Sequence, residues 1–193
     1  MRLIITFISA LVLLYGLANA SEHKIDDSHT SVGFSVKHLM ITNVKGEFKI
    51  FKGNLDFNHE NKTFKVLKAI VETKSVDTGI EKRDKHLRSK DFFLTTKYPE
   101  MTFVMTSYEK DDETEGKMIG DLTIRGITKS VTFDVEDIGT IKDFKGINRV
   151  GFTLKGKINR HDFNLKWNKA LEFGGVAVSN TVKITVDIEA IEL

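Results

Sequence analysis

The sequence predicts an all-β fold, an eight-stranded antiparallel up-and-down β-barrel, with a short helix near residues 79–90 that caps one end. Apolar and polar residues alternate in eight separate segments, which is the period of strands with one buried face. Strands and helices do not alternate along the chain as they do in βαβ units, so sequence neighbours should pair antiparallel. A two-sheet sandwich is the alternative, but closure into a barrel removes the edge strands that a sandwich leaves exposed.

The eight predicted strands differ in regularity. They comprise residues 31–37, 45–50, 64–76, 101–106, 118–125, 131–136, 152–158 and 182–188. The third is the least regular, because its apolar residues occupy both parities. Pro99 precedes the fourth strand, where a missing amide donor is tolerated. The acidic residues between Asp111 and Glu115 indicate a solvated hairpin loop and not a catalytic pair of carboxylates.

One segment between the third and fourth strands departs from the alternation. Thr78 and Glu81 have the spacing of a capping box, and the residues that follow favour a helix of about three turns. On a helical period Arg83 and Asp84 share a face with Leu87. Charges on a buried face need partners, so either the sheet supplies them or the helix covers a cavity with a polar mouth.

Residues 1–20 are expected to be a cleaved signal peptide. Arg2 precedes the apolar run 3–17, and A-N-A at residues 18–20 has the pattern of a cleavage site. The run is shorter than the ~20 residues of a spanning helix, so stable membrane insertion is not expected. Residues 21–193 then form a single exported domain, located in the periplasm or secreted.

Composition excludes several classes of function. The 29 basic and 27 acidic residues are mixed along the chain, so there is no broad positive field for nucleic acid. The absence of cysteine excludes disulfides, thiolate nucleophiles and cysteine metal cages. A nucleophile elbow of the G-x-S-x-G type is also missing. No nucleic-acid partner, no cofactor and no catalytic residue are therefore assigned.

Two alternatives to a binding protein stay open. The six histidines lack the i, i+4 spacing of a helical zinc pair, but His38, His86 and Asp84 could converge at one barrel end as a metal or acid–base site of an enzyme. An interaction module using its outer sheet face is the other alternative. It would need an apolar outer patch, whereas the outward positions of the predicted strands are mostly Lys, Thr, Ser, Glu and Asp.

The aromatic composition points to the barrel interior. Phe contributes 14 residues against three Tyr and one Trp, and these bulky rings either fill a lumen or line it. A helix face that carries Arg83 and Asp84 favours a lined cavity with a polar rim. The residues predicted to bind a ligand there are Phe34, Val36, His38, Phe48, Phe51, Leu67, Arg83, His86, Leu87, Met101, Phe103, Met105, Leu122, Ile124, Phe133, Phe152, Leu154, Trp167 and Ile184.

Several motifs, taken in order, carry a family resemblance. They are Ile25-Asp26, H-T-S-V-G-F-S-V-K-H at 29–38, G-x-F-x-x-F-x-G at 46–53, R-D-x-H-L-R-S-x-D-F-F at 83–93, Tyr98-Pro99 with Phe103, G-D-L-T-I-R-G-I-T at 120–128 and I-N-R-H-D-F at 158–163. On these motifs the sequence resembles the YceI-like family of exported, lipocalin-like lipid-binding proteins. Asn164 departs from the pattern, because many members carry glycine after the D-F pair.

The resemblance implies an extended lipocalin-like barrel that holds a polyisoprenoid lipid, or the tail of an isoprenoid quinone, in its lumen. It implies no catalytic residues. His38, Arg83, His86 and Arg88 are the candidates for contacting a polar head group, since Arg and His donate hydrogen bonds to a carbonyl or a phosphate. Structural ion pairing is the rival role for Arg83 with Asp84. Association into a homodimer is left open.

Overall fold

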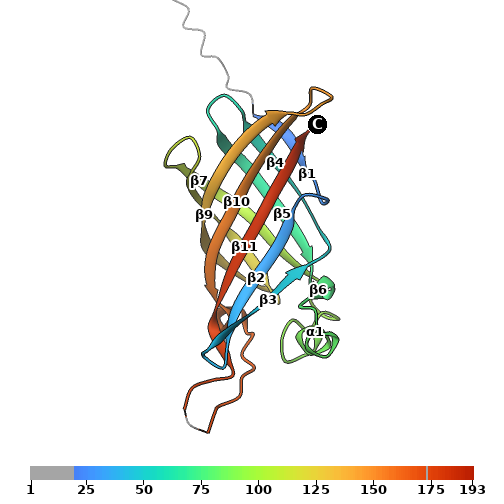
Figure 1. Ribbon diagram of the computed structural model, residues 1–193, viewed down its shortest axis with the longest axis vertical. Coiled ribbons are helices and arrows are strands. Elements are labelled where there is room, and N and C mark those ends of the chain that lie inside the picture. Colours follow the sequence, from blue (N-terminus) through green and yellow to red (C-terminus); the bar gives the residue numbers. More distant parts are fainter. Residues whose placement is uncertain (1–19, 173) are drawn as a thin grey trace, which may run out of the picture.

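The computed structural model describes residues 20–172 and 174–193, so residues 1–19 of the expected signal peptide lie outside the described part. Figure 1 shows an elongated antiparallel barrel with one helix at its lower end. The strands are β1 (Ser21–Ile25), β2 (Ser31–His38), β3 (Thr42–Phe48), β4 (Phe51–Asn58), β5 (Thr63–Glu72), β6 (Val76–Asp77), β7 (Glu100–Lys110), β8 (Gly116–Ile124), β9 (Ile127–Lys142), β10 (Asn148–Asn159) and β11 (Val178–Glu192). The helix is α1 (Glu81–Arg88), and Thr73–Ser75 and Arg160–Phe163 form short 3₁₀ turns.

Eight strands close the barrel, which confirms the predicted fold class. They follow the order β1-β4-β5-β7-β8-β9-β10-β11, and β11 pairs back onto β1. The other three strands extend the wall toward the lower end, because β2 pairs along β11, β3 along β2 and β6 along β3. Within the described residues β6 and β7 do not pair, and the chain that joins them forms α1.

Three strands were not predicted separately: β1, β4 and the two-residue β6, which a 3₁₀ turn separates from β5 although residues 64–76 were expected to form one strand. The strand β4 follows β3 after a short bend, and its apolar residues were not recognised as a separate strand. The strand β1 buries His23, whose side chain is fully inaccessible, at a position where alternation would require an apolar residue. The polar side chain of His23 therefore hid β1, a strand that is needed to close the barrel, from the alternation pattern.

The helix is shorter than predicted, and its predicted cap is wrong. It has eight residues, its N-cap is Ile80, and no side chain caps it. The Thr78 hydroxyl donates instead to Asp84 Oδ1 at 2.5 Å, and the Thr78 amide donates to the same oxygen at 3.0 Å. A carboxylate in the first turn therefore replaces the expected Thr78–Glu81 capping box. None of the helices in the described residues is long and apolar enough to cross a membrane.

The upper end of the barrel is packed solid. The Phe64 ring lies 4.9 Å from the centroids of both Phe57 and Tyr108 and 4.7 Å from that of Phe152. Phe57 is completely buried beside Leu55. These side chains close the lumen at the end where β1 begins.

A histidine pair lies at this sealed end. His23 Nδ1 donates to the Ser21 carbonyl at 2.8 Å, so the neutral His23 ring accepts at Nε2 from His59 Nε2, also at 2.8 Å. Burial lowers the pKa of His59 from its ordinary value, and the nearby His23 ring acts in the same direction. Protonation of His59 is therefore disfavoured in the folded protein.

The pair predicts a pH dependence of stability. Because the folded-state pKa of His59 lies below its unfolded value of 6.5, its contribution is present above pH 6.5 and is lost as pH falls toward the folded-state pKa. We expect His59→Gln, which keeps a donor for His23, to weaken the fall in the free energy of unfolding below pH 6.5. Urea titrations of both proteins across this range measure it. An identical pH slope in the variant would contradict the assignment.

Candidate functional site

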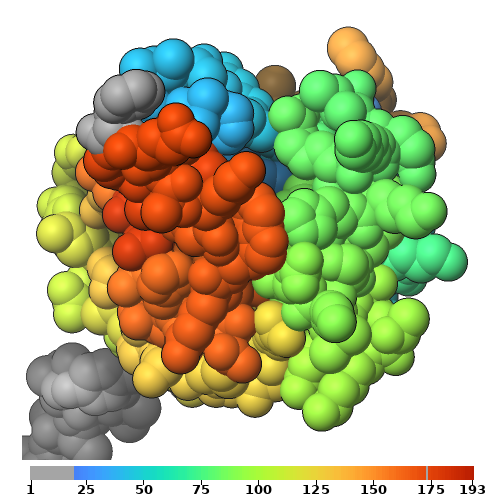
Figure 2. Space-filling model, turned by 90° about the horizontal axis from the view of Figure 1, so that it is seen from below, coloured from blue at the N-terminus to red at the C-terminus, as the bar shows by residue number. Residues whose placement is uncertain are grey.

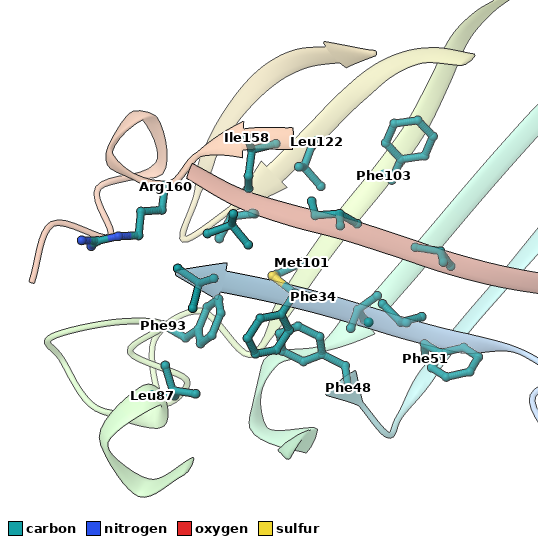
Figure 3. Close-up of a pocket in the computed structure, with 18 of the residues that line it drawn as sticks. Phe34, Phe48, Phe51, Leu87, Phe93, Met101, Phe103, Leu122, Ile158 and Arg160 are labelled. Atoms are coloured by element: carbon teal, nitrogen blue, oxygen red, sulfur yellow. The ribbon is translucent and has the colours of Figure 1, made fainter. Parts of the chain in front are cut away.

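The lower half of the barrel encloses a cavity of about 370 Å³, within the range of about 300–1,000 Å³ typical of small-molecule sites. Every strand of the closed ring contributes at least one lining residue, and α1 and the chain on either side of the second 3₁₀ turn complete the wall. Figure 3 shows aromatic and aliphatic side chains along the lumen, with Arg160 toward the end where α1 lies. The cavity is long and apolar, and most of its strand residues share one parity; Gly33, Lys52 and Thr102 border it from the other parity.

Glycines explain why the Phe side chains line the lumen without filling it. Phe34 pairs across the sheet with Gly46, and a Cβ at Gly46 would lie 2.5 Å from Phe34 Cζ. Gly156 offers the same close approach to the Phe133 ring, at 2.6 Å. Because these rings lie against bare backbone, they occupy the wall, and the space between opposite walls stays open.

Most of the predicted ligand-binding residues line this cavity. They are Phe34, Val36, His38, Phe48, Phe51, Leu67, Arg83, His86, Leu87, Met101, Phe103, Leu122, Ile124, Phe133, Leu154, Trp167 and Ile184. Met105 and Phe152 do not line it. Phe152 is buried in the aromatic packing of the upper end, and Met105 stands at a break in the β7–β8 register. The alternation indicated the correct face, but it did not show where along that face the lumen stops being open.

Sequence reasoning missed other lining residues. Val32, Val182 and Val186 share the parity of predicted neighbours, so the alternation could have identified them. Phe93 contacts Phe48 at 5.6 Å between ring centroids, but it comes from the loop after α1, where no period applies. Arg160 lies in the I-N-R-H-D-F motif at 158–163, but neither the motif nor the alternation indicated that its side chain borders the cavity.

The charged groups on the cavity wall are all cationic. Among the described residues they are Lys52, Arg83 and Arg160, and no carboxylate lines the cavity. Arg83 donates from Nε to the Thr78 hydroxyl at 2.7 Å and from Nη2 to the Thr78 carbonyl at 2.8 Å. Asp84 is buried and accepts hydrogen bonds from the amide and the hydroxyl of the same threonine. The Arg83–Asp84 pair thus orders the start of α1 through Thr78, and its two members do not bond each other directly.

The two other head-group candidates on α1 differ in position. His86 lines the cavity, donates from Nε2 to Asp91 Oδ2 at 3.0 Å, and packs edge-on against Phe92 and Trp167. Arg88 does not line the cavity. Its guanidinium donates to the carbonyls of Lys74 and Val76, which fastens α1 to the start of β6 and the 3₁₀ turn before it.

Arg160 is the most deeply buried cation of the site, with 3% of its surface exposed. Its guanidinium donates to the carbonyls of Ser179, Leu165, Trp167 and Val178. Burial lowers the pKa of Arg160 from its ordinary value. Among the described residues it forms no ion pair, so backbone carbonyls alone offset its desolvation.

The residues of the alternative metal or acid–base site do not come together. Among the described residues, His38, His86 and Asp84 do not bring their ligand atoms within 4.8 Å of one another, and Asp84 is occupied by Thr78. The group that does satisfy this distance is Asp26, His29 and Glu189. Arg149 donates to both of its carboxylates, at 3.0 and 2.5 Å, so a guanidinium already supplies the positive charge there.

Comparisons with known proteins agree with this geometry. A family model described as YceI-like domain matches residues 23–190. Protein YceI of Shigella flexneri is 39% identical over 190 residues, covering 97% of this chain and 95% of that protein. The crystal structure of the Campylobacter jejuni YCEI protein is 41% identical with a TM-score of 0.73, covering 87% of this chain and 96% of that one. A polyisoprenoid binding domain from Saccharophagus degradans shares the fold at 13% identity, with a TM-score of 0.61 and coverages of 90% and 99%.

Proposed function

Because the chain belongs to the YceI-like domain family, we propose that it binds a polyisoprenoid lipid, with the isoprenoid tail in the barrel cavity. The observation that carries the proposal is a continuous apolar lumen, sealed by aromatic packing at one end and covered by α1 and the segment after Arg160 at the other. A polyisoprenoid tail is a long, narrow chain of methyl-branched units, and such a chain fits this space. The polyisoprenoid-binding neighbour of the same fold supports this ligand class.

The energetics suit a carrier. Transfer of a prenyl tail from water would gain roughly 25 cal/mol per Å² of apolar surface buried. The tail starts in a bilayer that is as apolar as the cavity, so transfer from membrane to protein gains little hydrophobic free energy. Packing and head-group contacts then decide the balance, and the ligand can be both loaded and released.

The finer features of the function belong to the same proposal. A head group at the mouth, a phosphate or a quinone carbonyl, would meet His38, Arg83 and His86 on the cationic wall. The expected signal peptide places the protein in the periplasm or outside the cell. No residue constellation of the described chain supports catalysis at the mouth, so we propose a binding protein and not an enzyme.

Blocking the lumen tests the proposal. Ala69 lines the cavity on β5, while its neighbour Lys68 is exposed. We expect Ala69→Trp to weaken binding of a fluorescent farnesyl or longer prenyl probe by at least about tenfold, because the indole occupies the volume of the tail. Fluorescence titration in detergent measures the affinity, and organic extraction with mass spectrometry of the purified wild-type protein identifies what co-purifies.

Lys68→Trp is the matched control, since it adds the same ring on the outer face of the same strand. Loss of affinity in both variants would show general damage to β5. Unchanged affinity in Ala69→Trp, or wild-type protein that neither yields an isoprenoid on extraction nor binds the probe, would refute the lumen as the binding site.

A further inference from the structure

The turn between β2 and β3 has a backbone conformation that its bulky apolar residues adopt only at a cost. The Ile41 amide donates to the His38 carbonyl at 3.1 Å, and the two central residues, Leu39 and Met40, have φ of 50° and 66°. Positive φ at both central positions is the conformation that Asn and Gly adopt most readily, and bulky side chains adopt it at a cost in free energy. The sequence therefore stores local strain here, which persists in proteins chiefly where it serves a function.

The same turn exposes its apolar side chains to solvent. Leu39 is 39% exposed, Met40 59% and Ile41 80%. A water-soluble surface gains nothing from three consecutive large apolar side chains at a hairpin tip, where polar turn residues would also relieve the strain. Strain and exposure together indicate that these side chains contact an apolar medium outside the barrel.

The turn stands at the rim of the cavity. His38, the residue before it, lines the lumen. The Leu39 amide donates to the Ala177 carbonyl at 2.9 Å, and a side chain at Gly175 would meet Met40 Cγ at 3.5 Å. Figure 2 shows this end of the molecule, with the β2–β3 hairpin, the segment from Arg160 to Val178 and the region of α1 meeting around a central depression.

Exposed lysines outnumber exposed carboxylates at the end of the barrel that carries the turn. On β2 and the segments that form this end, the exposed lysines are Lys37, Lys82, Lys85, Lys90, Lys97, Lys166 and Lys169, and the exposed carboxylates are Glu81, Asp162 and Glu172. Exposed cations beside a small apolar tip are the combination that attracts a protein to anionic phospholipid head groups.

We propose that this end of the barrel docks on the surface of an anionic phospholipid bilayer, with Leu39, Met40 and Ile41 inserted among the head groups. Docking places the cavity mouth against the lipid phase, so a prenyl tail enters the lumen without crossing water. The proposal rests on the proposed function, because a ligand that resides in a membrane must be collected there. It adds the surface through which that ligand is exchanged.

The opposite end of the barrel provides a contrast. The β9–β10 hairpin exposes Phe144 fully and Ile141 to 69%, with Lys142 and Lys145 beside them. This tip also combines exposed apolar side chains with exposed lysines, but it adjoins the end that Phe57, Phe64 and Phe152 seal. Exposed apolar residues there have no path to the cavity, so they test whether docking depends on the mouth.

The experiment replaces the strained pair by residues suited to the turn. In the Leu39→Asn, Met40→Gly double variant we expect co-flotation with vesicles of phosphatidylethanolamine and phosphatidylglycerol (3:1) to fall by at least about tenfold, while the urea midpoint of unfolding rises because the strain is relieved. Prenyl-probe affinity in detergent should stay unchanged, and wild-type flotation should decrease with added salt and on phosphatidylcholine vesicles. Phe144→Ser is the matched control, and it should float like the wild type.

The outcomes separate the two proposals. Full flotation of the double variant, or equal loss in Phe144→Ser, would overturn docking through the mouth. The proposal would also fail if neither protein bound vesicles and sedimentation showed a dimeric wild type and a monomeric double variant. That result would show that a second copy of the chain covers the turn. Failure of the proposed function gives a different pattern, in which vesicle binding depends on the turn but the wild-type protein binds no prenyl probe.

Discussion

Replacing Phe57 with alanine is expected to lower the free energy of unfolding by about 4 kcal/mol. The Phe57 side chain is fully buried and has rings on several sides, with centroids 4.9 Å away at Phe64 and 5.1 Å away at His59. Truncation leaves a void in the packed end of the barrel, where closed strands cannot move together to fill it. Urea denaturation of the purified protein without added lipid measures the loss.

Phe34→Ala is the matched comparison in the open half. Phe34 has one side against Gly46 and lines the cavity, so part of its surface has no packing partner in the protein without ligand. We expect a cost of about 1.5 kcal/mol without ligand, and a larger cost when a prenyl lipid fills the lumen and supplies that partner. Equal costs for the two Phe residues without ligand would mean that the lower half is packed as tightly as the upper.

The alternation of polar and apolar residues was sufficient for the wall of the barrel. It predicted the strands that pair over long stretches, such as β10 with β11, because each has one dry face along most of its length. It failed where polar groups are buried in pairs. His23 can be buried because it hydrogen bonds to Ser21 and His59, and these partners cannot be recognised from a single sequence.

The candidate site divides in the same way. Residues on strands, such as Val36 and Leu154, line the cavity because parity fixes the direction of their side chains. The roles of the charged residues on α1 could not be assigned from sequence, because Arg83 and Asp84 both hydrogen bond to Thr78, a residue outside the helix. Arg160 belongs to the I-N-R-H-D-F motif, but its place in the site was missed because its partners are backbone carbonyls, which any sequence supplies.

Replacing Arg160 with methionine is expected to lower the free energy of unfolding by about 3 kcal/mol. Methionine has a similar stem, but it removes the donor that Arg160 supplies to the carbonyls of Leu165, Trp167 and Ser179. The segment between residues 165 and 179, which covers the mouth, should then open more often. Urea denaturation gives the stability, and hydrogen exchange of amides in this segment gives the opening.

Arg160→Lys distinguishes a role in positioning this segment from a role in holding the ligand. Lysine keeps the charge, but it cannot span carbonyls that lie on both sides of a planar guanidinium, so most of the stability loss should remain. If Arg160 mainly positions the segment, both variants lose stability without ligand, and saturating prenyl lipid still stabilises each of them. If it instead served chiefly as a counter-charge for an anionic head group, Arg160→Lys would retain stability and binding, and Arg160→Met would lose only the stabilisation that the ligand provides.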